Sequence, residues 1–121
     1  MVGTLLVVED EAHIRQFIAV NLAVRGYTCL QAESAEEGLE QLRGHNPAGL
    51  LLDIKLPGMS GWDMLKTIHA DRDLPNLPVI VITASLTLDR TDEPTYPNIL
   101  DKLIKPISAV ELISAVQKIF R

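Results

Sequence analysis

The chain has 121 residues and a formal net charge of −5, and 47% of its residues are apolar. These values predict one soluble globular domain over residues 1–121 that buries about two-thirds of the surface exposed by its unfolded chain. The acidic balance argues against direct binding of nucleic acid, because phosphate recognition needs a basic face. The single cysteine, Cys29, excludes an intrachain disulfide, and no apolar run reaches membrane-spanning length, so we expect a cytoplasmic protein that contacts no membrane.

Short apolar runs alternate with helical patterns along the chain. The runs are too short for helices and are bounded by turn residues, which is typical of strands buried on both faces. Strands are therefore expected at residues 5–8, 27–32, 49–53, 79–83 and 100–104. Helices are expected from about residue 14 to residue 26, from 34 to about 44, from about 61 to 70, and from 108 to 120.

Three serines mark predicted helix starts. A serine followed three residues later by an acidic residue has the spacing of a capping box, in which side chains accept hydrogen bonds from the free amides of the first helical turn. The pairs are Ser34 with Glu37, Ser60 with Asp63, and Ser108 with Glu111.

Residues 85–99 interrupt the alternation of strands and helices. A helix is due between the fourth and fifth strands, but this segment contains Pro94, Pro97 and several threonines, and it has no apolar stripe. Proline and β-branched residues disfavour a regular helix, so we expect a short, distorted or mobile one.

The alternation as a whole predicts an α/β fold. We expect a doubly wound, five-stranded parallel sheet with helices on both faces and right-handed crossovers. In the flavodoxin-like strand order 2-1-3-4-5, the first and third strands are neighbours and the second lies at the far edge.

Four neighbouring strands of this sheet end in polar residues: Glu9 and Asp10 follow the first, Asp53 ends the third, Thr83 the fourth, and Lys105 follows the fifth. Their carboxyl ends converge on one ligand-binding edge. Clustered carboxylates suit Mg²⁺, and a carboxylate is a competent nucleophile toward phosphoryl groups. The hydroxyl and the ammonium could contact phosphoryl oxygens. The three histidines, His13, His45 and His69, are expected on the surface, away from the strand ends.

The sequence resembles the receiver domain of two-component response regulators over its whole length. Four motifs carry the resemblance: residues 7–11 (VVEDE), 52–61 (LDIKLPGMSG), 82–84 (ITA) and 105–106 (KP). The resemblance implies that Asp53 accepts a phosphoryl group from a histidine kinase or phosphotransfer protein, and that Thr83 and Lys105 contact that group. It also implies a cis peptide between Lys105 and Pro106.

The same resemblance implies the ligands of a magnesium ion. Asp10 and Asp53 would ligate Mg²⁺, Glu9 would hold it through water, and the backbone carbonyl of Lys55 would complete the protein ligands. The resemblance places any output domain outside these residues and leaves the oligomeric state, including a homodimer, open. One departure is Lys102, which stands where receivers commonly carry an aromatic residue; that residue couples phosphorylation to the output face.

Three other functions are compatible with parts of this pattern. A phosphorylation-independent interaction module would keep the fold, but the complete set of acids, threonine and lysine argues against it. A phosphatase of the haloacid-dehalogenase type needs a second aspartate two residues after the nucleophile, where this chain has Lys55. A flavin carrier needs a phosphate loop rich in glycine and hydroxyl groups after the first strand, where this chain has residues 9–11 (EDE).

Overall fold

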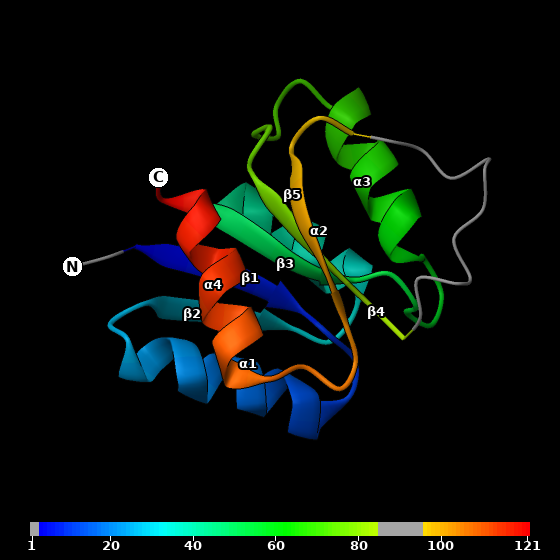
Figure 1. The fold of residues 1–121 in the computed structure, drawn as a ribbon. Coiled ribbons are helices and arrows are strands. Elements are labelled where there is room, and N and C mark those ends of the chain that lie inside the picture. The colour runs from blue at the N-terminus through cyan, green and yellow to red at the C-terminus, as the bar shows by residue number, and fades with distance from the viewer. Residues whose placement is uncertain (1–2, 85–95) are drawn as a thin grey trace.

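The computed structural model describes residues 3–84 and 96–121. Its centre is a parallel sheet in the order β2-β1-β3-β4-β5 (Figure 1). The strands are β1 (Thr4–Val8), β2 (Thr28–Ala32), β3 (Gly49–Asp53), β4 (Val79–Thr83) and β5 (Ile99–Ile104). The predicted fold class and strand order are confirmed, and each strand lies within one residue of its predicted bounds.

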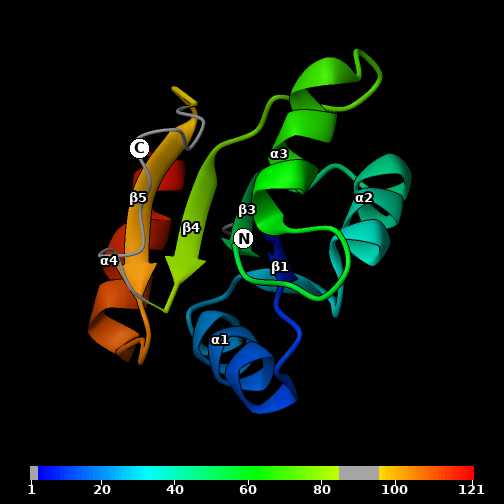
Figure 2. The same cartoon turned by 90° about the vertical axis from the view of Figure 1, so that its right-hand side faces the viewer.

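Four described helices cover the sheet: α1 (Ala12–Val24), α2 (Ala35–Gly44), α3 (Gly61–Ala70) and α4 (Ala109–Ile119). Helices α1 and α4 lie on one face and α2 and α3 on the other (Figure 2). The further helix expected within residues 85–99 falls on residues 85–95, which lie outside the described part of the chain. Within the described residues, no helix is long and apolar enough to cross a membrane.

The predicted serine caps form at the starts of α2, α3 and α4. Each serine hydroxyl accepts a hydrogen bond of 3.1 Å from the backbone amide three residues later. Among the described helices, α3 has the complete capping box, because Asp63 also accepts from the amide of Ser60 at 3.3 Å. Glu37 instead accepts from the amide of Glu33, and Glu111 accepts from the Ser108 hydroxyl.

The two faces of the sheet are both apolar, which explains the continuous apolar runs in the sequence. Alternate residues of one strand point to opposite faces, so Leu50 and Leu52 pack against α2 and α3 while Leu51 packs against α1 and α4. All three leucines are fully buried. The sheet thereby separates two hydrophobic clusters, and the ends of β1 and β3 are held rigidly between them.

A glycine lets the chain turn closely beneath the end of β3. The amide of Gly61 donates to the carbonyl of Ile54 at 2.9 Å. A Cβ atom on Gly61 would lie 2.6 Å from the backbone oxygen of Asp53 and 2.7 Å from the Cα of Ile54. Only a residue without a side chain fits there, and α3 therefore begins directly against the backbone of Asp53.

Candidate functional site

The register of the sheet brings the predicted site residues to one edge. Val8 of β1 pairs with Leu52 of β3, so Glu9 and Asp53 follow these residues side by side. At the other side of the site, the backbone amide of Lys105 donates to the carbonyl of Thr83 at 2.9 Å. Parallel strands end at a common edge, and four of them deliver polar side chains there, as the sequence predicted.

Three carboxylates meet at this edge. One oxygen each from Glu9, Asp10 and Asp53 lies within 4.8 Å of the others. Glu9 is 0% exposed and Asp53 is 1% exposed, which is unusual for acidic residues. Oxygen Oε1 of Glu9 is buried and has no hydrogen-bond partner among residues 3–84 and 96–121. An all-oxygen donor set with one unsatisfied buried oxygen fits a hard divalent cation such as Mg²⁺.

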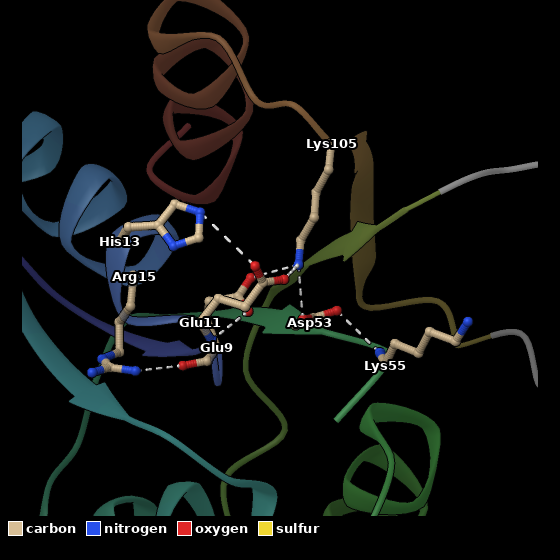
Figure 3. A network of polar contacts seen from close by, with 7 residues as sticks. All are labelled: Glu9, Glu11, His13, Arg15, Asp53, Lys55 and Lys105. Carbon is tan, nitrogen blue, oxygen red and sulfur yellow. Dashed lines mark hydrogen bonds and ion pairs between the residues drawn. The ribbon is translucent and has the colours of Figure 1, made fainter. Parts of the chain in front are cut away.

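The ammonium group of Lys105 lies among these carboxylates (Figure 3). Its Nζ donates to Asp53 Oδ2 at 3.0 Å and lies 2.9 Å from Glu9 Oε1, in ion-pair but not hydrogen-bond geometry. A third carboxylate oxygen, Oε1 of Glu11, lies 3.6 Å away. One cation thus partly neutralises two buried acids that would otherwise repel each other.

The pKa values of Glu9 and Lys105 are both raised, through the combined effects of burial and the neighbouring charges. Burial raises the pKa of Glu9 from 4.5 to about 7, although the ion pair with Lys105 and the hydrogen bond from the amide of Glu11 oppose the change. Burial alone would lower the pKa of Lys105, but its contacts with Glu9 and Asp53 outweigh that effect and raise it. The lysine therefore stays charged beside a glutamate that ionises reluctantly.

The loop after β3 holds the Asp53 carboxylate in place. Oxygen Oδ1 accepts from the backbone amide of Lys55 at 3.0 Å, while Oδ2 accepts from Lys105. Figure 3 shows the side chain of Lys55 directed away from the carboxylates. Both oxygens of Asp53 are therefore oriented before any ligand binds. The role predicted for the backbone carbonyl of Lys55 stays a prediction.

Two contacts from the beginning of α1 fix Glu9. Its second oxygen, Oε2, accepts from the backbone amide of Glu11 at 3.1 Å. The guanidinium of Arg15 donates to the backbone carbonyl of Glu9 at 2.8 Å. Sequence reasoning missed Arg15. The sequence does contain a signal for this residue: α1 begins shortly after β1, so the first turns of α1 lie at the same edge as the strand ends.

His13 was predicted to lie away from the strand ends, and this was wrong. It is exposed, but it stands on the first turn of α1, where its Nε2 lies 3.9 Å from Glu11 Oε2. Together with Phe17 and Ile107 it also lines a cavity of about 520 Å³ that reaches Lys105. The other two histidines, His45 and His69, are exposed, as predicted.

The side chains of Lys102 and Trp62 lie next to each other. The Nζ of Lys102, on β5, is 5.9 Å from the centre of the Trp62 ring, within the range of a cation–π contact. Trp62 is half-buried and packs against the hydrophobic cluster beneath α2 and α3, as expected for a packing residue. The residue that replaces the usual aromatic side chain thus contacts an aromatic ring on another element.

The peptide between Lys105 and Pro106 is cis, as the resemblance implied. This X-Pro bond is the sole cis peptide among the described residues, and it lies directly after the lysine that reaches Asp53. The strand end, the lysine and the cis proline therefore all belong to the same turn at the edge of the site.

Comparison with known proteins gives consistent matches over the whole chain. Residues 5–117 match the response regulator receiver domain family. The phosphate regulon transcriptional regulatory protein PhoB of Pseudomonas aeruginosa is 35% identical over 122 residues, which cover 100% of this chain and 53% of PhoB. The chemotaxis protein CheY of the same organism is 32% identical over 117 residues, which cover 96% of this chain and 94% of CheY. The chain spans about half the length of PhoB but nearly all of CheY.

Solved structures show the same fold. A putative response regulator from Chloroflexus aurantiacus superposes with a TM-score of 0.87 at 28% identity, and the match covers 98% of each chain. This superposition includes the sheet and all four described helices, since it spans nearly the whole chain.

Proposed function

Because this chain belongs to the family of response regulator receiver domains, we propose that it is a phosphoryl-accepting switch of a two-component system. Residues 1–121 form one receiver domain, and Asp53 accepts the phosphoryl group from a histidine kinase or phosphotransfer protein. The observation that carries the proposal is the arrangement of Asp53: a buried carboxylate, already oriented by the amide of Lys55, beside a lysine and two further acids.

The residues at the site divide the chemistry among them. A carboxylate oxygen of Asp53 forms a bond to the phosphorus while the bond from phosphorus to the donor nitrogen breaks, so the imidazole of the donor leaves. Lys105 neutralises charge on the phosphoryl oxygens, and Thr83 donates a hydrogen bond to one of them. The same groups serve the later hydrolysis, in which a water oxygen forms a bond to the phosphorus while the bond from phosphorus to Asp53 breaks, so that phosphate leaves and the carboxylate is restored.

Magnesium suits the remaining residues of the site. Glu9, Asp10, Asp53 and the backbone carbonyl of Lys55 are the groups that would hold it, with Glu9 acting through water. When bound, Mg²⁺ supplies positive charge that offsets the negative charge of the carboxylates and phosphoryl oxygens. The orphaned oxygen Oε1 of Glu9 supports a cation at this position.

The consequence of phosphorylation is a shift between two conformations rather than turnover of a substrate. The phosphoryl group on Asp53 stabilises one conformation more than the other and thereby increases its population. The output lies outside residues 1–121, in a partner or in a further domain; PhoB, of which this chain spans about half, is named as a transcriptional regulator.

Intact mass spectrometry tests this function. With Mg²⁺ and acetyl phosphate, the wild-type protein should gain the mass of one phosphoryl group, and chelating Mg²⁺ should prevent the gain. Asp53→Ala should gain nothing, whereas Glu40→Gln, an exposed acid on α2, should behave as wild type. An unchanged wild-type mass, or equal labelling of Asp53→Ala, would refute phosphorylation at Asp53 and favour the interaction module.

A further inference from the structure

Glu11 occupies a position that the preceding description of the site leaves without a role. It is the N-cap residue of α1, yet within the described residues its side chain makes no capping hydrogen bond. Its carboxylate is half exposed and turns toward the site, with Oε1 3.6 Å from Lys105 Nζ and Oε2 3.9 Å from His13 Nε2 (Figure 3). Glu11 is therefore a third carboxylate partner of Lys105, outside the cluster of Glu9, Asp10 and Asp53.

The position of Lys105 conflicts with cation binding. Its ammonium lies within 3.0 Å of both buried members of the acidic cluster, Glu9 and Asp53. A divalent cation bound to the same cluster would compete for those carboxylate oxygens and would repel the ammonium. Lys105 must therefore loosen its contacts with Glu9 and Asp53 when the cluster is loaded, and its long side chain then needs another partner to stay near the site.

We propose that Glu11 is this partner, a positioning residue that retains Lys105 at the rim of the site while a cation occupies the acidic cluster. Held there, the ammonium stays beside Asp53 and meets the incoming phosphoryl oxygens. This inference rests on the proposed function. A half-exposed ion pair is weak and should change a binding affinity by about two- to five-fold. Such a weak contact lets Lys105 move between Glu11 and the acidic cluster.

The test is a double-mutant cycle on Mg²⁺ affinity, measured by isothermal titration calorimetry. Glu11→Gln should weaken Mg²⁺ binding about two- to five-fold, because Lys105 then loses the carboxylate that would hold it away from Glu9 and Asp53. Glu40→Gln removes the same charge from an exposed site on α2 and should change the affinity less. Lys105→Met should bind Mg²⁺ more tightly than wild type, and in that background Glu11→Gln should have no larger effect than Glu40→Gln.

A second measurement separates positioning from simple attraction of the cation. At saturating Mg²⁺, beryllofluoride should bind Glu11→Gln more weakly than wild type, and Glu11→Asp, which keeps the charge, should restore part of the affinity. Equal Mg²⁺ affinities of Glu11→Gln and Glu40→Gln would overturn the inference, as would an undiminished effect of Glu11→Gln in Lys105→Met. Absence of Mg²⁺ binding by wild type would instead overturn the proposed function.

Discussion

Glu9 is a fully buried acid whose two oxygens have different surroundings. Oε2 accepts a backbone hydrogen bond from Glu11, whereas Oε1 has no hydrogen-bond partner in the described part of the chain and lies 2.9 Å from the ammonium of Lys105. Burial raises the pKa of Glu9 from 4.5 to about 7. At a pH between these two pKa values, Glu9 is protonated in the folded protein and ionised in the unfolded chain. Lowering the pH through this range therefore favours the folded state.

Glu9 should therefore make stability depend on pH when Mg²⁺ is absent. The free energy of unfolding should fall as pH rises from about 4.5 to about 7 and should level off above that, because both states then carry the charge. The raised pKa of Lys105 adds no slope in this window, since its contribution is lost only at higher pH. Urea unfolding in the presence of a metal chelator, repeated from pH 5 to pH 8, measures this change in the free energy of unfolding.

Glu9→Gln supplies the comparison for this experiment. The glutamine cannot titrate, so the fall in stability between pH 5 and pH 7 should be smaller in Glu9→Gln than in wild type, while Glu40→Gln should keep the wild-type slope. Identical slopes in wild type and Glu9→Gln would show that Glu9 ionises at an ordinary pKa despite its burial.

Single residues also mark the limit of prediction from sequence. Asp10, Asp53, Thr83 and Lys105 lie at the edge where the sequence placed them, because each stands at the end of a strand or within two residues after it, and the ends of parallel strands share an edge. Glu11 was not predicted to be a site residue, but its carboxylate lies 3.6 Å from the ammonium of Lys105. Whether a side chain at the start of a helix points toward the site depends on the residue at which the helix begins. The sequence pattern does not fix that residue exactly.

At the scale of elements, the beginning of α3 and the end of β3 are built as one unit. The capping box of Ser60 and Asp63 starts the helix, and Gly61 allows it to begin in contact with the backbone of Asp53. Any movement of α3 at its first turn therefore affects the backbone of Asp53.

Replacing Gly61 should consequently be costly. In Gly61→Ala the new Cβ would meet backbone atoms at 2.6 Å and 2.7 Å, and backbone cannot move aside as a flexible side chain can. We expect a loss of about 1–3 kcal/mol in the free energy of unfolding. Gly44→Ala is the matched control: no heavy atom of the described residues lies within 4 Å of a Cβ there, and the free energy of unfolding should rise by about 0.4–1 kcal/mol.

Urea unfolding of both variants decides this point. A Gly61→Ala protein as stable as wild type would mean that the turn between β3 and α3 shifts without cost. In that case the position of α3 would not be tied to Asp53.

The elements themselves were predictable for physical reasons that differ along the chain. Strands such as β4 were found from unbroken apolar and β-branched runs, and the starts of α2, α3 and α4 from serine caps. The second half of the capping box forms in α3 but not in α2 and α4, because Glu37 and Glu111 accept hydrogen bonds from other donors. The helix expected within residues 85–99 stays a prediction, since residues 85–95 lie outside the described part.

For the whole molecule, the sheet order followed from the chain's alternation of strands and helices together with the position of the charges. Placing β1 beside β3 was the step that brought Glu9 next to Asp53. This arrangement concentrates negative charge, which Lys105 neutralises only in part, at one edge of an otherwise apolar sheet. The folded state therefore stores repulsion that a bound cation would relieve.

Mg²⁺ should accordingly stabilise the folded protein. Only the folded chain assembles the acidic cluster, so the gain at a free Mg²⁺ concentration ten times the Kd is about 1.4 kcal/mol. This should raise Tm by about 4–8 °C. Differential scanning calorimetry at increasing Mg²⁺ gives the measurement. Asp53→Ala should respond less, and a wild-type Tm indifferent to millimolar Mg²⁺ would contradict a metal site.

The burial of β3 on both faces has a consequence for how this sequence can vary. Exchanges among leucine, isoleucine and valine within the strand cost less than about 1.5 kcal/mol, because either face accepts an apolar side chain. Its length has no such freedom. One inserted residue would carry Asp53 about 3.3 Å further along and turn it to the opposite face, away from Lys105. The position of Asp53 thus depends on the number of residues before it in β3 rather than on their identity.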